Sequence, residues 1–360
     1  MRLTKLIAIA ICLGLHVVSP FDAVAAEYSV RRPPKEVLAF YYGWYGNPQT
    51  SKQWVHWSGK NSSSQTIENI TDYPTDGAYD SHDAAEVMAQ TKAATAAGIT
   101  GLISSWWGKG DFTDRSLSML LDAAQQTHIH VSAYIERLDV HNNVLAEAAR
   151  VTQVEYLVRQ YGSHPAWLKV NGRPVFFIFQ NAYKPGAVEV SKLLNTVRAD
   201  LHPTPIFIGD VSVGADLDPH TFATSMDGIH GYNVRGLRSG MSIDAEMSVV
   251  RSNYAKWKLL SNTNQIFCLT VTPGADDSHL SDRPKPRPIT PRQGGMLYTQ
   301  MWRQAINENP DWILITSWNE WHEGTEIENS IQYKDLYLRL TKKFAEKFLQ
   351  STPTVDLKRR

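Results

Sequence analysis

The segment WILITSWNEWHEGTEIE, which runs from Trp312 to Glu328, carries the features that decide the fold class. It opens with an apolar run, Trp312 to Ser317, whose length and branched side chains are typical of a buried β-strand. Glu320 and Glu323 follow in a turn, three residues apart and flanked by aromatic residues. Chemically active residues placed directly after an apolar strand are typical of the carboxyl end of a parallel sheet, where α/β proteins build their sites.

Seven further apolar runs rich in Val, Ile and Phe precede this segment, and amphipathic stretches follow most of them. The predicted strands are Val37–Tyr42, Ile99–Ser105, Ile129–Ile135, Pro174–Phe179, Pro205–Gly209, Gly228–Tyr232, Gln265–Val271 and Trp312–Ser317. The predicted helices are Ala84–Ala97, Asp114–Gln126, Asn143–Tyr161, Ala187–Asp200, Asp244–Leu260, Arg292–Asn309 and Tyr333–Leu349. The connection between the fifth and sixth strands shows no clear helical pattern. This alternation predicts an α/β fold, a single-domain (β/α)8 TIM barrel.

Two connections are long for such a barrel, Gly46 to Asp80 and Pro273 to Gly295, and we expect both to form long loops that wall a groove at its mouth. A doubly wound open sheet is the alternative architecture. It is disfavoured because no Gly-rich phosphate loop follows the first predicted strand.

The first residues predict export. A positively charged start precedes the apolar run Leu6 to Val18 and then small residues up to Ala26, the pattern of a secretory signal peptide. A transmembrane anchor would need about 20 continuous apolar residues, more than this run offers. We therefore assign residues 1–26 to a signal peptide, 27–351 to the barrel domain and 352–360 to a frayed tail, and expect a secreted or periplasmic protein. The mature chain keeps one cysteine, Cys268, which in an apolar strand is expected to fill the core.

Charge and aromatic placement indicate the kind of partner. The chain has 36 basic and 36 acidic residues and no basic stripe, which argues against a nucleic acid as partner. Several tryptophans fall in predicted loops, where flat rings suit the apolar faces of sugars. An oligosaccharide or polysaccharide substrate, a monomer and no membrane span after signal removal are expected.

Glu320 and Glu323 are the candidate catalytic residues. Glycosyl transfer uses two carboxyl groups near the anomeric carbon, one protonated and one ionised. Two like charges in one cleft raise one of the two pKa values, which supplies the protonated partner. The alternative is that these acids sit in the first turn of a helix, a reading that suits Glu326 and Glu328 better because no aromatic residue flanks them.

Other residues near strand ends are candidates for substrate binding. They are Tyr42, Trp44, Trp106, Glu136, Tyr232, Trp321 and His322. Glu136 could hold a sugar hydroxyl or pair structurally with Arg137. Asp83 is better read as a helix N-cap. The histidines show no closed ligand set with recognised spacing, so neither a metal nor another cofactor is expected.

The chain resembles glycoside hydrolase family 99, the endo-acting α-mannosidases and mannanases. The resemblance rests on stretches along most of the chain: FYYGWYGNP from Phe40, YDSHD from Tyr79, AGITGLISSWWG from Ala97, NGRPVF from Asn171 and SWNEWHEGTEIE from Ser317. It implies a TIM barrel and metal-free retaining hydrolysis of α-mannosides through a 1,2-anhydro sugar. By that pattern Glu323 looks like the general acid/base and Glu320 like the base that deprotonates the sugar 2-hydroxyl, with Glu136, Tyr42, Trp106 and Tyr232 as binding residues.

The chain departs from the family pattern at three positions. Trp318 stands where Phe is expected, Glu326 where Gln is expected, and His82 where a small residue is usual. These changes leave both glutamates in place but affect the expected substrate. A hydrolase of another bacterial polysaccharide, or a noncatalytic carbohydrate-binding barrel, therefore remains an alternative to α-mannoside cleavage.

Overall fold

The structure is a computed structural model, and it describes residues 33–57, 67, 69–138, 147–179, 186–212, 225–236, 240–262, 264–280, 285 and 287–351. The expected signal peptide, 1–26, and the expected tail, 352–360, lie outside these residues.

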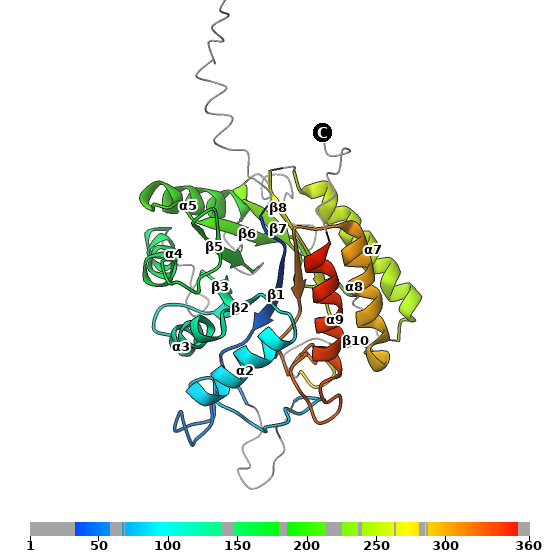
Figure 1. Cartoon of the computed structure of the whole chain (residues 1–360). Helices are drawn as coiled ribbons and strands as arrows, with labels where there is room; N and C mark the ends of the chain where they lie inside the picture. The colour runs from blue at the N-terminus through cyan, green and yellow to red at the C-terminus, as the bar shows by residue number, and fades with distance from the viewer. Residues whose placement is uncertain are drawn as a thin grey trace, which may run out of the picture. The chain divides into compact units, whose positions relative to one another are not determined.

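Parallel strands form a closed barrel at the centre of the described chain (Figure 1). The strands are β1 (Glu36–Tyr41), β2 (Gly101–Trp106), β3 (His130–Ile135), β5 (Arg173–Ile178), β6 (Ile206–Asp210), β7 (Gly228–His230), β8 (Ile266–Val271) and β11 (Trp312–Ile315). β1 pairs with both β2 and β11, and the pairing of Tyr134 with Phe177 closes the ring between β3 and β5. All the predicted strands are present, and the TIM-barrel prediction is confirmed.

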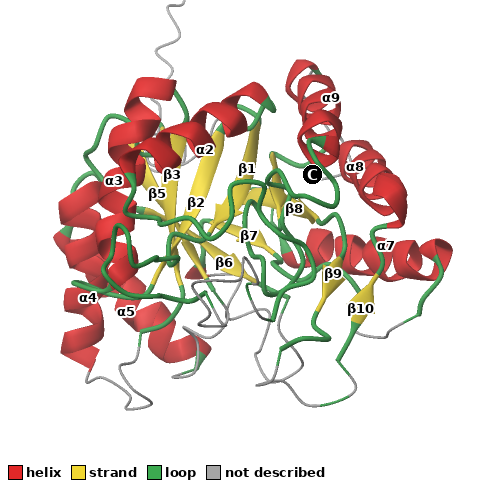
Figure 2. Cartoon of the chain, turned by 90° about the horizontal axis from the view of Figure 1, so that it is seen from below, coloured by secondary structure: helices red, strands yellow, loops and turns green. Residues whose placement is uncertain are grey.

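Helices surround the barrel, as the view from below shows (Figure 2). They are α2 (Ala84–Ala96), α3 (Phe112–Thr127), α4 (Glu147–Tyr161), α5 (Ala187–Asp200), α7 (Ile243–Leu260), α8 (Met296–Glu308), with the short η2 (Gln293–Gly295) before it, and α9 (Leu336–Gln350). Asp83 caps α2 by accepting the amide of Ala85, as expected. Most of the connection between β6 and β7, residues 213–224, lies outside the described residues.

The structure contains short strands that were not predicted from the sequence. β4 (Lys169–Val170) pairs antiparallel with β5, and β9 (Ala275–Asp276) pairs with β10 (Ile289–Thr290) inside the long loop after β8. The backbone amide of Asp276 donates to the carbonyl of Glu323 at 2.8 Å. The loop after β8 therefore contacts the turn that carries the candidate glutamates.

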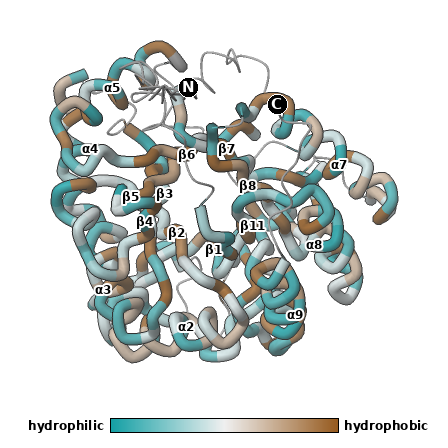
Figure 3. The backbone as a smooth tube through the Cα atoms, turned by 45° about the horizontal axis from the view of Figure 1, so that its top comes forward, coloured by the Kyte–Doolittle hydropathy of each residue, from teal (hydrophilic) through white to brown (hydrophobic). Residues whose placement is uncertain are grey.

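Alternation along each strand divides the core into two layers. Leu38, Phe40 and Tyr42 belong to the cluster inside the barrel, whereas Val37 and Ala39 pack with the helices outside it. The backbone tube coloured by hydropathy has brown, apolar stretches along several of the central strands, and the helices around them alternate between apolar and polar residues (Figure 3). No helix in the described part of the chain has the length and apolarity needed to cross a bilayer.

His230 occupies the barrel interior, where a charged imidazole is unfavourable. Its ring packs near Phe40, Tyr134 and Phe177, and neither ring nitrogen has a hydrogen-bond partner among the described residues. Burial lowers its pKa from 6.5 to about 4, although the charge of Asp210 acts in the opposite direction. The folded protein thus keeps this imidazole neutral over a pH range in which the unfolded chain protonates it.

We expect His230→Phe to remove part of the acid sensitivity. With a lowered folded-state pKa, the stability that a neutral His230 confers is present above pH 6.5 and is lost as the pH falls towards 4. The wild type should lose up to about 1.4 kcal/mol per pH unit relative to the variant over this window. Chemical denaturation of both proteins between pH 4.5 and 7 measures the difference between their free energies of unfolding. The contributions of the other titrating groups are common to both proteins and cancel in this difference. Parallel stability curves would contradict the assignment.

Candidate active site

The segment that carries the two glutamates is fastened to the end of β1. The amide of Trp318 donates to the carbonyl of Phe40 at 2.7 Å. The side chain of Asn319 accepts the amide of Tyr42 at 2.7 Å and donates to the carbonyl of Tyr42 at 3.0 Å. The side-chain amide of Asn319 thus bonds both the N–H and the C=O of Tyr42, as the backbone of an adjacent β-strand does. The segment after β11 is therefore placed at the mouth by the first strand.

Glu320 and Glu323 lie in a turn rather than in a helix, because the next helix, α9, begins only at Leu336. Glu320 is buried, and its backbone amide donates to Oγ of Ser317 at 2.8 Å. Glu323 is partly exposed. Gly324 has a φ of +57°, and a Cβ there would lie 3.0 Å from the backbone nitrogen of Asp276, so the turn requires glycine.

Two tyrosines that follow β1 and β7 meet above the core. The hydroxyl of Tyr42 donates to that of Tyr232 at 2.6 Å. Burial is the main reason that both pKa values lie well above 10, and the charges of Glu136, Glu320 and Glu323 raise them further. The three carboxyl groups and the two hydroxyl groups all follow the carboxyl ends of parallel barrel strands, so they lie at the same mouth of the barrel.

Glu136 follows β3 and is buried. Oγ of Ser105 donates to its carboxyl oxygen at 2.7 Å, whereas the guanidinium of Arg137 lies over the ring of Trp107, 4.9 Å from its centroid. Burial raises the pKa of Glu136 to about 8, and the charges of Glu323 and Asp210 act in the same direction. At neutral pH this carboxyl group is mostly protonated and can donate a hydrogen bond to a bound hydroxyl group.

Trp44 and His322 extend this mouth. Trp44, which is partly buried, stacks on His56 at a centroid distance of 3.9 Å and also contacts Tyr42. His322 is buried, with Nδ1 3.9 Å from a carboxyl oxygen of Glu320. Both candidates therefore lie beside the candidate catalytic residues.

Two candidates for substrate contact are placed elsewhere. Trp106 is fully buried in the outer layer, and its Nε1 donates to Asp114 of α3 at 2.9 Å. β2 extends one residue beyond its predicted end, so Trp106 points outwards and Trp107 is the residue that reaches Trp44 at the mouth. Trp321 is also fully buried, and its Nε1 donates a hydrogen bond to the hydroxyl of Tyr79. Neither Trp106 nor Trp321 has exposed surface in this structure, so neither side chain is available to contact a sugar directly.

The interpretation of Glu326 and Glu328 as helix-start residues was also wrong. Arg292 binds the carboxylate of Glu326 and donates to the backbone carbonyls of Glu326 and Gly324. Glu328 accepts the hydroxyl of Tyr79 at 2.9 Å and the amide of Gln90 at 2.7 Å. Both acids stabilise the far end of the segment.

The three departures from the family pattern all make contacts outside the glutamate cluster. Glu326 pairs with Arg292, and Trp318 belongs to the outer core layer. His82 stacks on Phe112 at a centroid distance of 3.7 Å. These contacts join the three side chains to neighbouring elements and not to either candidate glutamate.

Two groups that support the mouth were missed by sequence reasoning. Asp210, at the end of β6, accepts the amides of Ser212 and Tyr232, a position that the rule of strand ends could have found. The hydroxyl of Tyr79 accepts Asn319 Nδ2 and Trp321 Nε1, both at 3.0 Å, and donates to Glu328. Tyr79 begins the family-like stretch YDSHD, but the stretch does not indicate its partners, which lie some 240 residues away.

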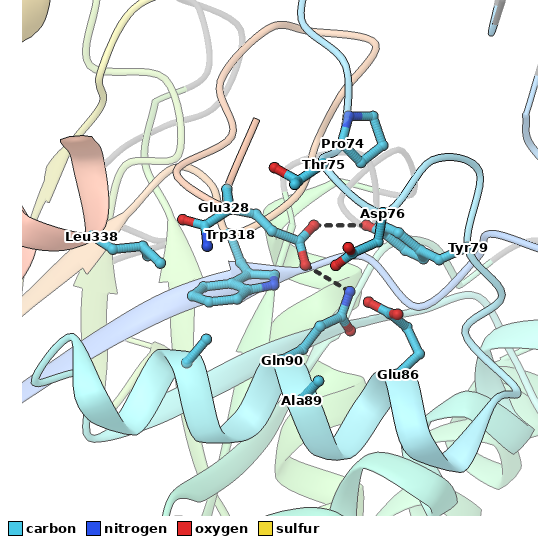
Figure 4. A pocket seen from close by; sticks show the side chains of 12 residues that line it. Pro74, Thr75, Asp76, Tyr79, Glu86, Ala89, Gln90, Trp318, Glu328 and Leu338 are labelled. Atoms are coloured by element: carbon cyan, nitrogen blue, oxygen red, sulfur yellow. Dashed lines mark hydrogen bonds between the residues drawn. The ribbon is translucent and has the colours of Figure 1, made fainter. Parts of the chain in front are cut away.

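A pocket of about 250 Å³ lies behind the segment, between α2 and α9 (Figure 4). Tyr79, Gln90, Trp318 and Glu328 line it, and Figure 4 shows the two hydrogen bonds that converge on Glu328. Neither candidate glutamate lines this pocket, which lies on the outer side of the segment. The pocket is therefore bounded by residues that support the segment, and it is not the candidate active site.

We expect Tyr79→Phe to reduce turnover more than substrate affinity. The change leaves the buried donors of Asn319 and Trp321 without their acceptor, which costs about 1–3 kcal/mol per unsatisfied group, and it loosens the turn that carries Glu320. kcat should fall at least about tenfold with a small change in KM, since small misplacement of catalytic groups costs rate.

Tyr298→Phe is the matched control for this test. It removes a buried hydroxyl that bonds Thr341 between α8 and α9. It should lower the melting temperature without changing kcat. Equal kcat values for Tyr79→Phe and the wild type would contradict the positioning role.

A parallel barrel whose mouth gathers carboxyl groups, tyrosine hydroxyls and aromatic rings defines the chain as a glycoside hydrolase. The model of Glycosyl hydrolase family 99 matches residues 34–354. The chain belongs to this family.

Relatives with known names agree with this assignment. The glycoprotein endo-alpha-1,2-mannosidase of Mus musculus is 27% identical over 93% of this chain and 80% of its own length. The structure of the GH99 endo-alpha-mannosidase from Bacteroides thetaiotaomicron has a TM-score of 0.72 at 28% identity, covering 87% of this chain and 97% of that one. A GH5_18 structure from Streptomyces cattleya, at 11% identity and a TM-score of 0.56, shares the fold alone.

Proposed function

We propose that this hydrolase cleaves α-mannosidic linkages in a glycan or mannan, with retention of configuration, through a 1,2-anhydro sugar. The observation that carries the proposal is that Glu320, Glu323 and the hydrogen-bonded Tyr42–Tyr232 pair follow strand ends at one mouth of the barrel. The names of the relatives, endo-α-mannosidases, support the choice of sugar.

In the proposed first step Glu320 removes the proton of the sugar 2-hydroxyl, and the 2-oxygen attacks the anomeric carbon. The bond to the leaving oxygen breaks as Glu323 protonates that oxygen. In the second step Glu323 takes a proton from water, the water oxygen attacks the anomeric carbon, and Glu320 returns the proton to the 2-oxygen. Each carboxyl group ends the cycle in its starting state, and the neutral carboxyl of Glu136 is available to orient a sugar hydroxyl.

We expect the 2-hydroxyl to be indispensable. A substrate that carries it as a methyl ether, or lacks it, should bind without being cleaved, because the internal nucleophile is missing. A panel of α-mannan, high-mannose glycan and other bacterial polysaccharides, with sizing of the products, identifies the parent substrate first. Its 2-deoxy analogue is then compared for turnover, and the enzyme is examined by mass spectrometry. Efficient cleavage of the analogue, or a glycosyl ester on Glu320, would return the site to ordinary double displacement.

We also propose that the protein is exported. The charged start and apolar run before Ala26 support this. N-terminal sequencing of the protein from the periplasm or medium should find a chain that begins near Glu27, and recovery of the intact Met1 form from the cytoplasm alone would contradict it.

A further inference from the structure

Three potential metal ligands meet at the mouth. His56 comes from the loop between β1 and α2, while Glu320 and His322 come from the segment after β11. One ligand atom from each of these residues lies within 4.8 Å of those of the other two. Nδ1 of His322 is 3.9 Å from a carboxyl oxygen of Glu320, and the two imidazole rings are 4.7 Å apart at an angle of 82°.

His322, like His230 in the barrel interior, is a buried imidazole without a hydrogen-bond partner in the described part of the chain, but it lies beside a carboxylate and a second imidazole. It is only 7% exposed, and neither ring nitrogen has a hydrogen-bond partner among the described residues. Buried polar groups in proteins are normally paired, so a side chain that retains two unpaired nitrogens needs an explanation.

The surrounding rings orient the histidines. Trp44 stacks on His56 with an interplanar angle of 25°, and Tyr45 lies nearly parallel to His322 at 15°. Both imidazoles therefore pack against an aromatic neighbour, which reduces the side-chain freedom that is lost when a ligand binds between them.

The donor set suits zinc. Two imidazoles and one carboxylate, with a fourth position open to solvent, is a recognised tetrahedral Zn²⁺ arrangement, in which bonds of about 2.0–2.2 Å bring ligand atoms roughly 3.4 Å apart. The ligand atoms, which lie up to 4.8 Å apart, would have to approach one another by up to about 1.4 Å, which a rotation of the exposed His56 side chain can supply.

We propose that His56, Glu320 and His322 form a Zn²⁺ site, and that the bound ion inhibits the hydrolase by occupying the carboxylate of Glu320. Binding of the ion follows from the three ligands alone. The inhibition rests on the proposed function, in which Glu320 must be free to accept a proton. Zinc is then an antagonist of this site and no cofactor.

The test uses the whole mature protein without a polyhistidine tag, treated with EDTA and then dialysed. Calorimetric titration with ZnCl₂ should give one ion per chain, and Co²⁺ should give the visible absorption of a tetrahedral site. His56→Phe keeps a ring to stack on Trp44 but removes one ligand, and His322→Asn removes another. Each variant should weaken zinc binding at least about tenfold, because loss of even an indirect partner of a metal site costs about 10–100-fold.

His128→Asn is the matched control. His128 is exposed at the opposite end of β3, with a φ of +58° that asparagine tolerates, and its replacement should leave zinc affinity unchanged. No bound ion, or binding that survives in both ligand variants, would overturn the site.

Activity decides the second part of the proposal. With the substrate found by the glycan panel, saturating Zn²⁺ should abolish turnover and EDTA should restore it. Full activity of the zinc-loaded protein would overturn the inhibition. A protein that cleaves no glycan even after EDTA treatment would refute the proposed function instead, while the titration would still decide the site.

Discussion

Glu320→Gln is expected to abolish turnover on every substrate, whereas Glu323→Gln is expected to keep activity on substrates with very good leaving groups. In the proposed mechanism Glu320 generates the nucleophile, and an amide cannot accept that proton. General acid–base groups contribute about 10²–10⁴-fold to rate, so losses of this size are expected for Glu320→Gln with any leaving group.

The two variants are separated by the leaving group. A glycosyl fluoride needs no protonation of its leaving group, so Glu323→Gln should cleave the fluoride far better than the natural substrate, and Glu320→Gln should cleave neither. Glu86→Gln is the control, since it makes the same chemical change in the pocket behind the segment. Equal losses on both substrates for both variants would contradict the division of roles.

Trp106→Ala is expected to destabilise the fold severely, and Trp107→Ala to weaken glycan binding instead. Trp106 is fully buried against the helices and hydrogen-bonded to Asp114. Its truncation should cost about 3–5 kcal/mol of the free energy of unfolding. Trp107 is partly exposed beside Trp44, and losing its ring should cost on the order of 1 kcal/mol of binding.

Chemical denaturation and glycan binding by the folded protein measure the two effects separately. Adjacent residues of the same type serve here as controls for each other. A stable Trp106→Ala protein with weakened binding would show that Trp106, rather than Trp107, faces the substrate.

The local pattern of apolar runs along the sequence was sufficient to predict the barrel fold. Each apolar run needs only its own composition and length to become a strand, and parallel strands in a barrel bring their carboxyl ends to one face. For this reason the sequence alone located Glu320, Glu323, Glu136, Tyr42 and Tyr232 near one another. The boundaries were less secure, and a strand end misplaced by one residue was enough to exchange Trp106 for Trp107, because side chains alternate with a period of two.

Only the tertiary structure decided what supports and surrounds these residues. Glu326 lies beside Arg292, Tyr79 bonds Asn319, and His56 meets His322 because loops far apart in sequence converge once the barrel closes. Such contacts depend on the pairing of β1 with β11 and on the paths of the loops, and no local periodicity records either of them. The sequence alone thus determined which residues end at the mouth, whereas closure of the barrel decided which of them face it, which are buried behind it and which could bind a metal together.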